Sequence, residues 1–403
     1  MASRTGSILG YATSVGVSAI VTLISIPIIV GAAGAQAWGA LAVGQAIGTG
    51  AAILINFGWG TTGPTEVARA DAGLRSALYE DSFRARLALA LPVVIVAVAA
   101  TSLATSSASG EAALNAAAFA LTGLLAGWYF TGASQPLLFL FLDTGPRVVG
   151  AAAGATAVLL GSPLVFFPLL QLAGILVGVV LSTRKVSGFR RLRSIRGFGA
   201  VPTILRAQSH GVVLAIVSAS YASIPAAVVA VVAPSGVPVY ALVDKLLRFA
   251  TTAYAPIIQF LQGHVPTGTF ADVRRKIRSS LIAGGGMAVL GAALFIVLAP
   301  WLSSFLSHGE ISPPFEIVVG FALALFFMVA SQIVGLVCLL ALGQSSELAK
   351  RSAVGVVIGL PAIVAGAIIA GVLGAALALA FAEALACSLQ VLLLRKALRR
   401  GDH

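Results

Sequence analysis

Three charged residues lie inside one apolar stretch of the sequence, VPVYALVDKLLRFATTAYAPIIQFL at 237–261. On a helix, Asp244 and Arg248 are four residues apart and can pair, while Lys245 shares a face with Arg248 at a spacing of three. Each charge at the centre of a bilayer costs roughly 2.5–3.5 kcal/mol on insertion scales. The stretch therefore predicts a water-filled cavity that passes an anion, with all three residues binding it. The alternative is a local Asp244–Arg248 pair, with Lys245 extending toward the membrane edge.

Other polar residues in apolar runs are further candidates. Gln45 and Asn56 are eleven residues apart, which places them on one helix face. They could line the same cavity or form hydrogen bonds between helices. Glu383 is interpreted either as a protonatable site for ion coupling or as a carboxyl group kept neutral by burial. Asp143 is expected to be an ordinary loop residue.

No catalytic or metal site is predicted. The four histidines are scattered, and the two cysteines, Cys338 and Cys387, lie in apolar runs. A zinc site needs more ligands than this, and the sequence contains no Gly-rich phosphate loop followed by Lys and Ser or Thr. We therefore expect a protein that is not an enzyme and that has no cofactor.

The composition predicts an integral membrane protein. The 403 residues are 59% hydrophobic and 9% charged, whereas a soluble domain has about 25% charged residues. Runs of about 20 apolar residues can each cross a bilayer as a helix, and the first is too long to be a typical signal peptide. Twelve such runs are predicted: 8–31, 37–58, 85–105, 112–131, 147–166, 168–183, 207–232, 238–261, 281–303, 316–341, 353–372 and 374–394. The fifth and sixth runs have the least sharply marked ends, and the fifth could start early, at 136–142.

The distribution of Lys and Arg predicts the topology. With twelve spans, all of these residues outside the 238–261 run fall on one side, while loops such as GAAGAQ and SHGEISPP on the other side have none. The positive-inside rule then places both termini in the cytoplasm. The net charge of +12 is thus a topology signal and does not indicate nucleic acid. Binding of membrane lipids through their anionic headgroups is a secondary expectation.

A weak internal repeat suggests two halves. The tripeptide SIP occurs at 25–27 and 223–225, and the following runs open with WGAL at 38–41 and YAL at 240–242. This predicts two six-helix bundles, 1–185 and 205–403, joined by a basic cytoplasmic linker at 186–204 and related by a pseudo-two-fold axis along the membrane normal. Pro27 and Pro225 would bend matching helices and act as hinges, although membrane helices also simply tolerate proline.

Several segments together resemble the Wzx-type polysaccharide flippases of the multidrug/oligosaccharidyl-lipid/polysaccharide exporter superfamily. These are INFGWGTTGPTEVARADAG at 55–73, GWYFTGASQP at 127–136 and the Tyr-x-x-x-x-Lys core in the run that starts at 238. The family element after Trp-Tyr-Phe often has an acidic residue, where this chain has Ser134 and Gln135. That departure, together with the short outer loops, puts the substrate in doubt.

The resemblance implies a V-shaped protein with a central cavity in the bacterial cytoplasmic membrane. It implies a polyprenyl-pyrophosphate-linked oligosaccharide as substrate, and a polysaccharide polymerase and glycosyltransferases as partners. The rival functions are a cation-coupled multidrug exporter of the same superfamily, a lipid-linked cell-wall precursor flippase, a membrane polymerase or ligase of polysaccharide, and a passive scaffold. A cell-wall precursor flippase commonly has two more helices, and a polymerase or ligase would need a longer outer loop to hold its catalytic residues.

Overall fold

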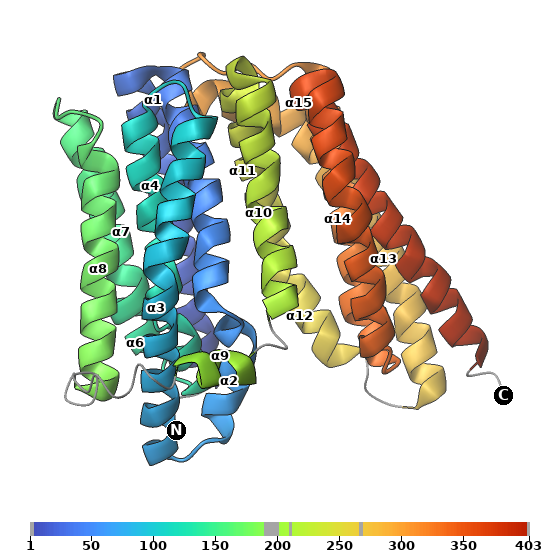
Figure 1. Ribbon diagram of the computed structural model, residues 1–403. Helices are drawn as coiled ribbons and strands as arrows, with labels where there is room; N and C mark the ends of the chain where they lie inside the picture. Colours follow the sequence, from blue (N-terminus) through green and yellow to red (C-terminus); the bar gives the residue numbers. More distant parts are fainter. Residues whose placement is uncertain (1–3, 189–200, 209–211, 266–268, 401–403) are drawn as a thin grey trace. The chain divides into compact units, whose positions relative to one another are not determined.

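The computed structural model describes residues 4–188, 201–208, 212–265 and 269–400 (Figure 1). Within these ranges the regular structure is helical throughout, and no strand occurs in them. The chain divides into two compact units. Unit 1 comprises 1–234 and 306–310, and unit 2 comprises 235–305 and 311–403.

Unit 1 contains the first ten helices and two irregular turns. The short turns are the 3₁₀ helix η1 (Thr122–Leu124) and the π-helix η2 (Phe139–Thr144). The helices are α1 (Arg4–Asn56), α2 (Trp59–Arg69), α3 (Ala72–Ala104), α4 (Ser109–Leu121), α5 (Gly127–Gly132), α6 (Pro136–Leu138), α7 (Gly145–Leu159), α8 (Phe166–Ser187), α9 (Val201–Ala207) and α10 (Val212–Val232).

Unit 2 contains the remaining helices. It begins near the 3₁₀ turn η5 (Pro234–Gly236) and includes the π-helix η6 (Ile333–Leu339). The helices are α11 (Val237–Ala253), α12 (Ala255–His264), α13 (Phe270–Leu306), α14 (Phe315–Gln332) and α15 (Ser345–Arg400). A reciprocal cap starts α13, since the Asp272 carboxylate accepts from the Thr269 N–H at 3.2 Å and the Asp272 N–H donates to the Thr269 hydroxyl at 3.3 Å.

The twelve predicted runs fall on helical segments of the described chain. Eight described helices are long and apolar enough to cross a membrane. Two of them, α1 and α15, would measure about 80 Å at 1.5 Å per residue, far more than the ~30 Å hydrocarbon core. Each is broken once, α1 at Gly34 (φ 80°) and α15 at Ala370 and Gly371. Each therefore supplies two of the predicted spans, and the fifth span does start early, at Pro136.

The compact units divide the chain at a different place from the predicted halves. Helix α10 packs on α1 and belongs to unit 1, so that the units meet at Pro234 and Ser235. Residues 189–200, most of the predicted linker, lie outside the described residues. The bundles at 1–185 and 205–403 thus stay a prediction.

Glycines let the helices of unit 1 approach closely. Helices α7 and α8 lie side by side (Figure 1), and a Cβ atom on Gly174 would lie 3.0 Å from the Cα atom of Gly150 and would also contact the Pro146 carbonyl. A second α7 glycine, Gly154, would similarly meet the Phe167 backbone of α8. This is the small-residue packing that stabilises helix pairs in lipid, where apolar burial gives no driving force.

Replacing Gly174 with Val is expected to destabilise unit 1 by about 1–3 kcal/mol, because the added methyl groups overfill the α7–α8 contact. The measurement is the thermal unfolding midpoint of the purified protein in detergent. Gly285→Val in α13 is the matched control, since a Cβ atom there meets nothing within 4 Å. Equal midpoints for the two variants would contradict the close packing.

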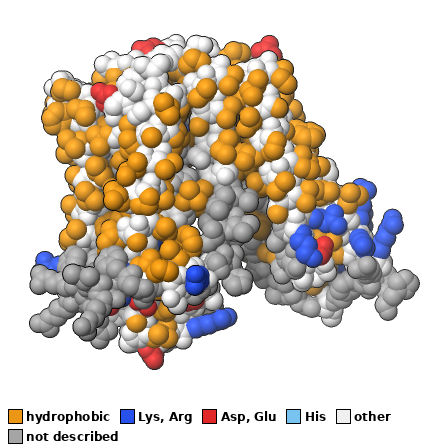
Figure 2. Space-filling view, in the orientation of Figure 1, with side chains coloured by type: hydrophobic (Ala, Val, Ile, Leu, Met, Phe, Trp, Pro, Cys, Tyr) orange, Lys and Arg blue, Asp and Glu red, His pale blue; other side chains and the backbone are white. Residues whose placement is uncertain are grey.

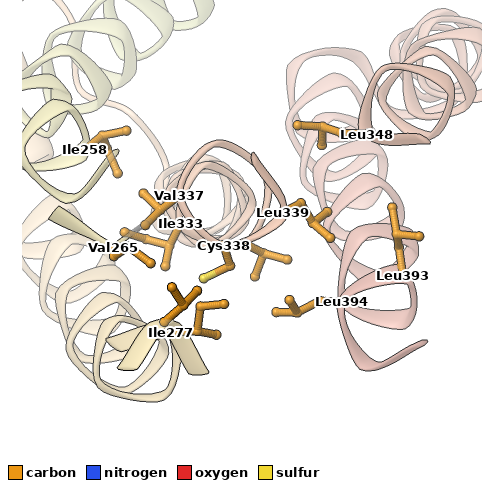
Figure 3. Packing of buried hydrophobic residues seen from close by; sticks show 12 residues of the cluster. Ile258, Val265, Ile277, Ile333, Val337, Cys338, Leu339, Leu348, Leu393 and Leu394 are labelled. Atoms are coloured by element: carbon orange, nitrogen blue, oxygen red, sulfur yellow. The ribbon is translucent and has the colours of Figure 1, made fainter. Parts of the chain in front are cut away.

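The end of unit 2 has a compact hydrophobic core (Figure 3). Residues of α12, α13, η6 and both ends of α15 converge on the buried Cys338. The core therefore gathers the start of α13 and both ends of α15 around η6. Its labelled members are Ile258, Val265, Ile277, Ile333, Val337, Leu339, Leu348, Leu393 and Leu394.

The outer surfaces of the long helices are aliphatic, as expected for a multi-pass membrane protein. On the face drawn in Figure 2, hydrophobic side chains cover the long helices of each unit, and the visible Lys and Arg side chains lie toward the helix ends. On α3, Leu91 and Leu103 are 70% and 86% exposed, a distribution that is stable in lipid but not in water.

Candidate functional site

Helix α11 has one buried face and one polar face. Its apolar face packs within unit 2, where the Tyr240 and Phe321 rings are 5.7 Å apart. Its polar residues fall at Asp244, Arg248 and Thr252, spaced four apart so that they form one stripe along the helix. The buried members are Val237, Pro238, Tyr240, Leu242, Val243, Leu246 and Leu247.

The predicted pair of Asp244 and Arg248 is confirmed. The Arg248 Nε donates to Asp244 Oδ2 at 2.7 Å. The Arg248 side chain is still 60% exposed, while that of Asp244 is 19% exposed. Lys245 lies half-buried next to the pair, about 12 Å along the helix from Val237 at 1.5 Å per residue. The group thus brings two cations and one carboxylate together well inside the predicted span.

The eighth span is interrupted just beyond these charges. Helix α11 ends at Ala253, and α12 begins at Ala255, with a proline at its second residue. The Thr251 and Thr252 hydroxyls both donate to the Arg248 carbonyl, at 2.9 and 2.8 Å, and so satisfy an oxygen near the end of α11. The Tyr254 hydroxyl donates to the Met287 carbonyl of α13 at 3.3 Å and anchors the interruption. Discontinuous helices of this kind form binding sites in transporters.

The other predicted candidates lie apart from this group in the chain. Gln45 and Asn56 occupy the second half of α1, in unit 1, where the helix ends in two residues of positive φ, Phe57 (48°) and Gly58 (93°). Helix α1 therefore ends within two residues of the end of the predicted 37–58 span. A cavity shared by Gln45, Asn56 and the α11 charges remains a prediction.

The predicted hinge and coupling residues have the expected helical positions. Pro27 lies inside α1 and Pro225 inside α10. The Pro27 carbonyl is 3.2 Å from the His308 ring Nε2, which must donate the hydrogen. Glu383 is half-buried in α15. Whether these residues act as hinges or in coupling remains a prediction.

Two buried charged residues, Arg86 and Asp143, were not predicted. Arg86 falls at the start of the predicted 85–105 run, where it lies inside α3 and is fully buried. Asp143 was expected to be an ordinary loop residue, but it lies in the π-helix η2 and is 4% exposed. The expectation for Asp143 was wrong because the helical structure extends beyond the predicted 147–166 run and buries this side chain between neighbours.

Arg86 and Asp143 hold the two ends of an interrupted helix. The Arg86 Nη1 donates to the Gly123 and Leu125 carbonyls, at 3.0 and 2.9 Å, where α4 and η1 end. The Asp143 carboxylate accepts from the Gly127 N–H, where α5 begins. A helix end has a partial negative charge at its carbonyls and a partial positive charge at its N–H groups. The two side chains therefore neutralise both ends of the break at 122–126.

Aromatic contacts complete this cluster. The Arg86 guanidinium lies over the Trp128 ring, 5.6 Å from its centroid, a favourable cation–π contact. Tyr79 stacks on Trp128 and its hydroxyl is 2.9 Å from the Thr183 hydroxyl of α8. The carboxylate of Asp143 also accepts from Arg147 at 3.3 Å. The cluster thus ties α3, α5, η2 and α8 together.

The segments 55–73 and 127–136 lie together in unit 1. Helix α2 packs on α5, because a Cβ atom on Gly63 would meet the Trp128 ring and one on Gly132 would meet Pro64 and Val67. A sequence signal for the buried cluster does exist in α3. Asp71 caps the helix by accepting from the Leu74 N–H at 2.8 Å, and Glu80 and Arg84 form an i,i+4 pair, so a helix starting well before the apolar run was readable.

No protein-family model matches the sequence, and no curated protein does either. Solved structures of membrane transporters do match. An inward-facing multidrug resistance MATE family transporter of the MOP superfamily matches with a TM-score of 0.70 at 13% identity, covering 93% of this chain and 94% of that one. The lipid II flippase MurJ, in an inward closed conformation, matches with a TM-score of 0.69 at 10% identity, covering 96% and 87%.

A eukaryotic MATE transporter, AtDTX14, matches with a TM-score of 0.55 at 12% identity and covers 98% of this chain and 96% of that one. At such identities these likenesses show the fold. The chain is an all-α multi-pass membrane protein with the MATE and MurJ fold of twelve helices in two bundles.

Proposed function

We propose that this protein moves a polyprenyl-pyrophosphate-linked oligosaccharide across the bacterial cytoplasmic membrane. The observation that most supports the proposal is the polar face of α11, where Lys245, Arg248 and Asp244 lie together within the predicted eighth span. Intramembrane charges of this kind mark substrate pathways. The fold shared with MurJ, whose name states that it flips lipid II, agrees with a lipid-linked substrate.

The physical need for such a protein follows from the headgroup. Each sugar hydroxyl costs roughly 4–8 kcal/mol to transfer bare into hydrocarbon, so the uncatalysed crossing is negligible. A polar passage lets the headgroup cross while the lipid tail stays in the bilayer. Lys245 and Arg248 would bind the pyrophosphate, and Asp244 would orient Arg248 and limit its hold so that the substrate is released.

The proposed cycle is alternating access by the two halves. Pro27 and Pro225 would be the hinges, Gln45 and Asn56 would contribute to the passage, and both termini would lie in the cytoplasm. A polysaccharide polymerase would take the product, and glycosyltransferases would supply the substrate. Such rocking of two helical bundles is the general mode of transporters built from repeats.

Multidrug export is the second candidate function, favoured by the fold shared with MATE transporters. A cationic drug would need an acidic site, whereas the α11 group has two cations for one carboxylate. The balance of charge at α11 therefore favours an anionic substrate.

Transport by the purified chain in vesicles distinguishes the two functions. We expect a fluorescent polyprenyl-pyrophosphate oligosaccharide to move from one leaflet to the other, where a quencher on that side of the membrane reaches its headgroup. A cationic dye is expected not to accumulate in the same vesicles. Dye transport without movement of the lipid would reject the flippase and favour the exporter.

Glu383→Gln is expected to abolish the response of the flipping rate to an imposed proton gradient, because the amide cannot take up a proton. Without a gradient, the variant should flip within about threefold of the rate of the unaltered protein. The measurement is the flipping rate with and without a pH difference across the vesicle. Glu316→Gln, at an exposed carboxyl at the start of α14, is the control. A gradient response that survives in Glu383→Gln would exclude Glu383 as the coupling site.

A further inference from the structure

Unit 2 has one strongly basic end, formed by the start of α13 and by the start and end of α15. These three segments are held together by the core around Cys338 (Figure 3). Figure 2 shows Lys and Arg side chains gathered there. Nine described cations belong to this basic end: Arg274, Arg275, Lys276, Arg278, Lys350, Arg351, Arg395, Lys396 and Arg399.

Few carboxylates accompany these cations. Asp272 and Glu347 are the acidic residues of the same segments in the described chain, and each already pairs within its own helix. Arg275 contacts Asp272 at 3.1 Å, and Lys350 contacts Glu347 at 2.7 Å. The end therefore has a large excess of positive charge, and the Arg275 and Lys350 side chains are still 79% and 68% exposed.

The described residues at the corresponding end of unit 1 include more carboxylates. There five described carboxylates, Glu66, Asp71, Glu80, Asp81 and Asp143, accompany its Arg and Lys residues. Some of those cations already have partners inside the unit. Arg75 donates hydrogen bonds to the Val67 and Ala70 carbonyls, and Arg84 forms ion pairs with Glu80 and Asp81.

Exposed aliphatic side chains lie one helical turn from the exposed cations. Arg278 precedes Ile282 by four residues, Lys350 precedes Val354 by four, and Lys396 follows Leu392 by four. Residues at this spacing share a helix face. Ile282, Val354 and Leu392 are 70%, 43% and 56% exposed. The same pairing of a charge with an aliphatic group thus occurs on all three segments of the basic end.

We propose that the basic end of unit 2 binds anionic phospholipids. The cations contact the headgroup phosphates at the level where the apolar spans of α13 and α15 begin and end, and the aliphatic residues one turn deeper contact the acyl chains. A soluble anion would use the cations but not the aliphatic residues. The site is separate from the α11 group and does not depend on which substrate the protein transports.

Binding of a fluorescent-acyl phosphatidylglycerol to the full-length protein in detergent tests the proposal. Phosphatidylcholine with the same acyl chain is the neutral control, and inorganic phosphate is the soluble competitor. We expect phosphatidylglycerol to bind at least tenfold more tightly than phosphatidylcholine. Each cation near an anionic surface contributes roughly a fivefold change in affinity. Arg278→Gln, Arg395→Gln and Lys396→Gln together should therefore weaken phosphatidylglycerol binding about 100-fold.

The matched variant removes the same charge from unit 1 through Arg184→Gln, Lys185→Gln and Arg206→Gln, all exposed residues. It should bind phosphatidylglycerol within about twofold of the unaltered protein, since the proposed site keeps its full charge. The double variant Ile282→Ser with Leu392→Ser should bind both lipids more weakly and should keep the preference for phosphatidylglycerol over phosphatidylcholine. Equal binding of the two lipids by the unaltered protein would overturn the proposal. Equal losses in the two triple variants, or displacement of the lipid by millimolar phosphate, would also overturn it.

Discussion

Replacing Lys245 and Arg248 together with Gln is expected to slow flipping of the lipid-linked oligosaccharide about 100-fold or more. A hydrogen bond to a charged group contributes roughly 1.5–3 kcal/mol, so each single replacement should cost about tenfold. The half-buried Lys245 and the Asp244-bound Arg248 would both contact the same pyrophosphate. The measurement is the initial flipping rate in vesicles at matched protein density.

The control for this prediction is a double replacement of equal charge, Arg184→Gln with Lys185→Gln, at the exposed end of α8. It should flip at the normal rate, because α8 has no part in the proposed passage. Lys245→Arg should retain much of the activity, since it keeps the charge. Normal flipping by a folded Lys245→Gln and Arg248→Gln double variant would remove these residues from the mechanism.

Replacing Arg86 with Leu is expected to destabilise the protein by about 3–5 kcal/mol, the cost of breaking a buried charged contact. Leucine leaves the Gly123 and Leu125 carbonyls without their donor and leaves Asp143 with one cation fewer nearby. Arg86→Lys should cost less, because one ammonium group can still donate to these carbonyls. The measurement is the unfolding midpoint together with amide hydrogen exchange across 122–130.

Amide exchange separates this local role from general destabilisation. We expect Arg86→Leu to speed exchange at 122–130 before it affects the helices of unit 2. Asp143→Asn should have a smaller effect, because the amide oxygen can still accept from the Gly127 N–H. Arg184→Gln, at an exposed position, should leave both the midpoint and the exchange unchanged. Unaltered exchange at 122–130 in Arg86→Leu would contradict the role assigned to the cluster.

The spans were predictable from the sequence because hydropathy is a local property. Each of the twelve runs overlaps a helix of the described chain, and the pair of Asp244 and Arg248 follows from helical spacing alone. The breaks in α1 and α15 were predictable as loops because a run of more than 50 residues exceeds the bilayer thickness.

The buried cluster in unit 1 was not predictable in the same way. Arg86 reaches carbonyls 37 and 39 residues along the chain, and Asp143 reaches Gly127 through a π-helix. Such contacts depend on which helices are neighbours, and apolar periodicity does not specify this. Assigning charged residues to loops predicts the topology. It misses the charged residues that are buried near the ends of helices.

In the proposed mechanism, the polar face of α11 is in contact with water inside the membrane. A cysteine at Thr252, the exposed hydroxyl residue of that face, tests it after Cys338 and Cys387 are replaced by Ala. The control cysteine replaces Val289, a 60% exposed aliphatic residue in the middle of α13. A charged, membrane-impermeant thiol reagent is added to both sides, since it modifies only thiols that water reaches.

We expect Thr252→Cys to react readily and Val289→Cys not to react, and we expect the lipid-linked oligosaccharide to protect the cysteine at 252. If the cysteine at 252 is as unreactive as the one at 289 in a folded protein, α11 faces no aqueous passage and the proposed mechanism is wrong.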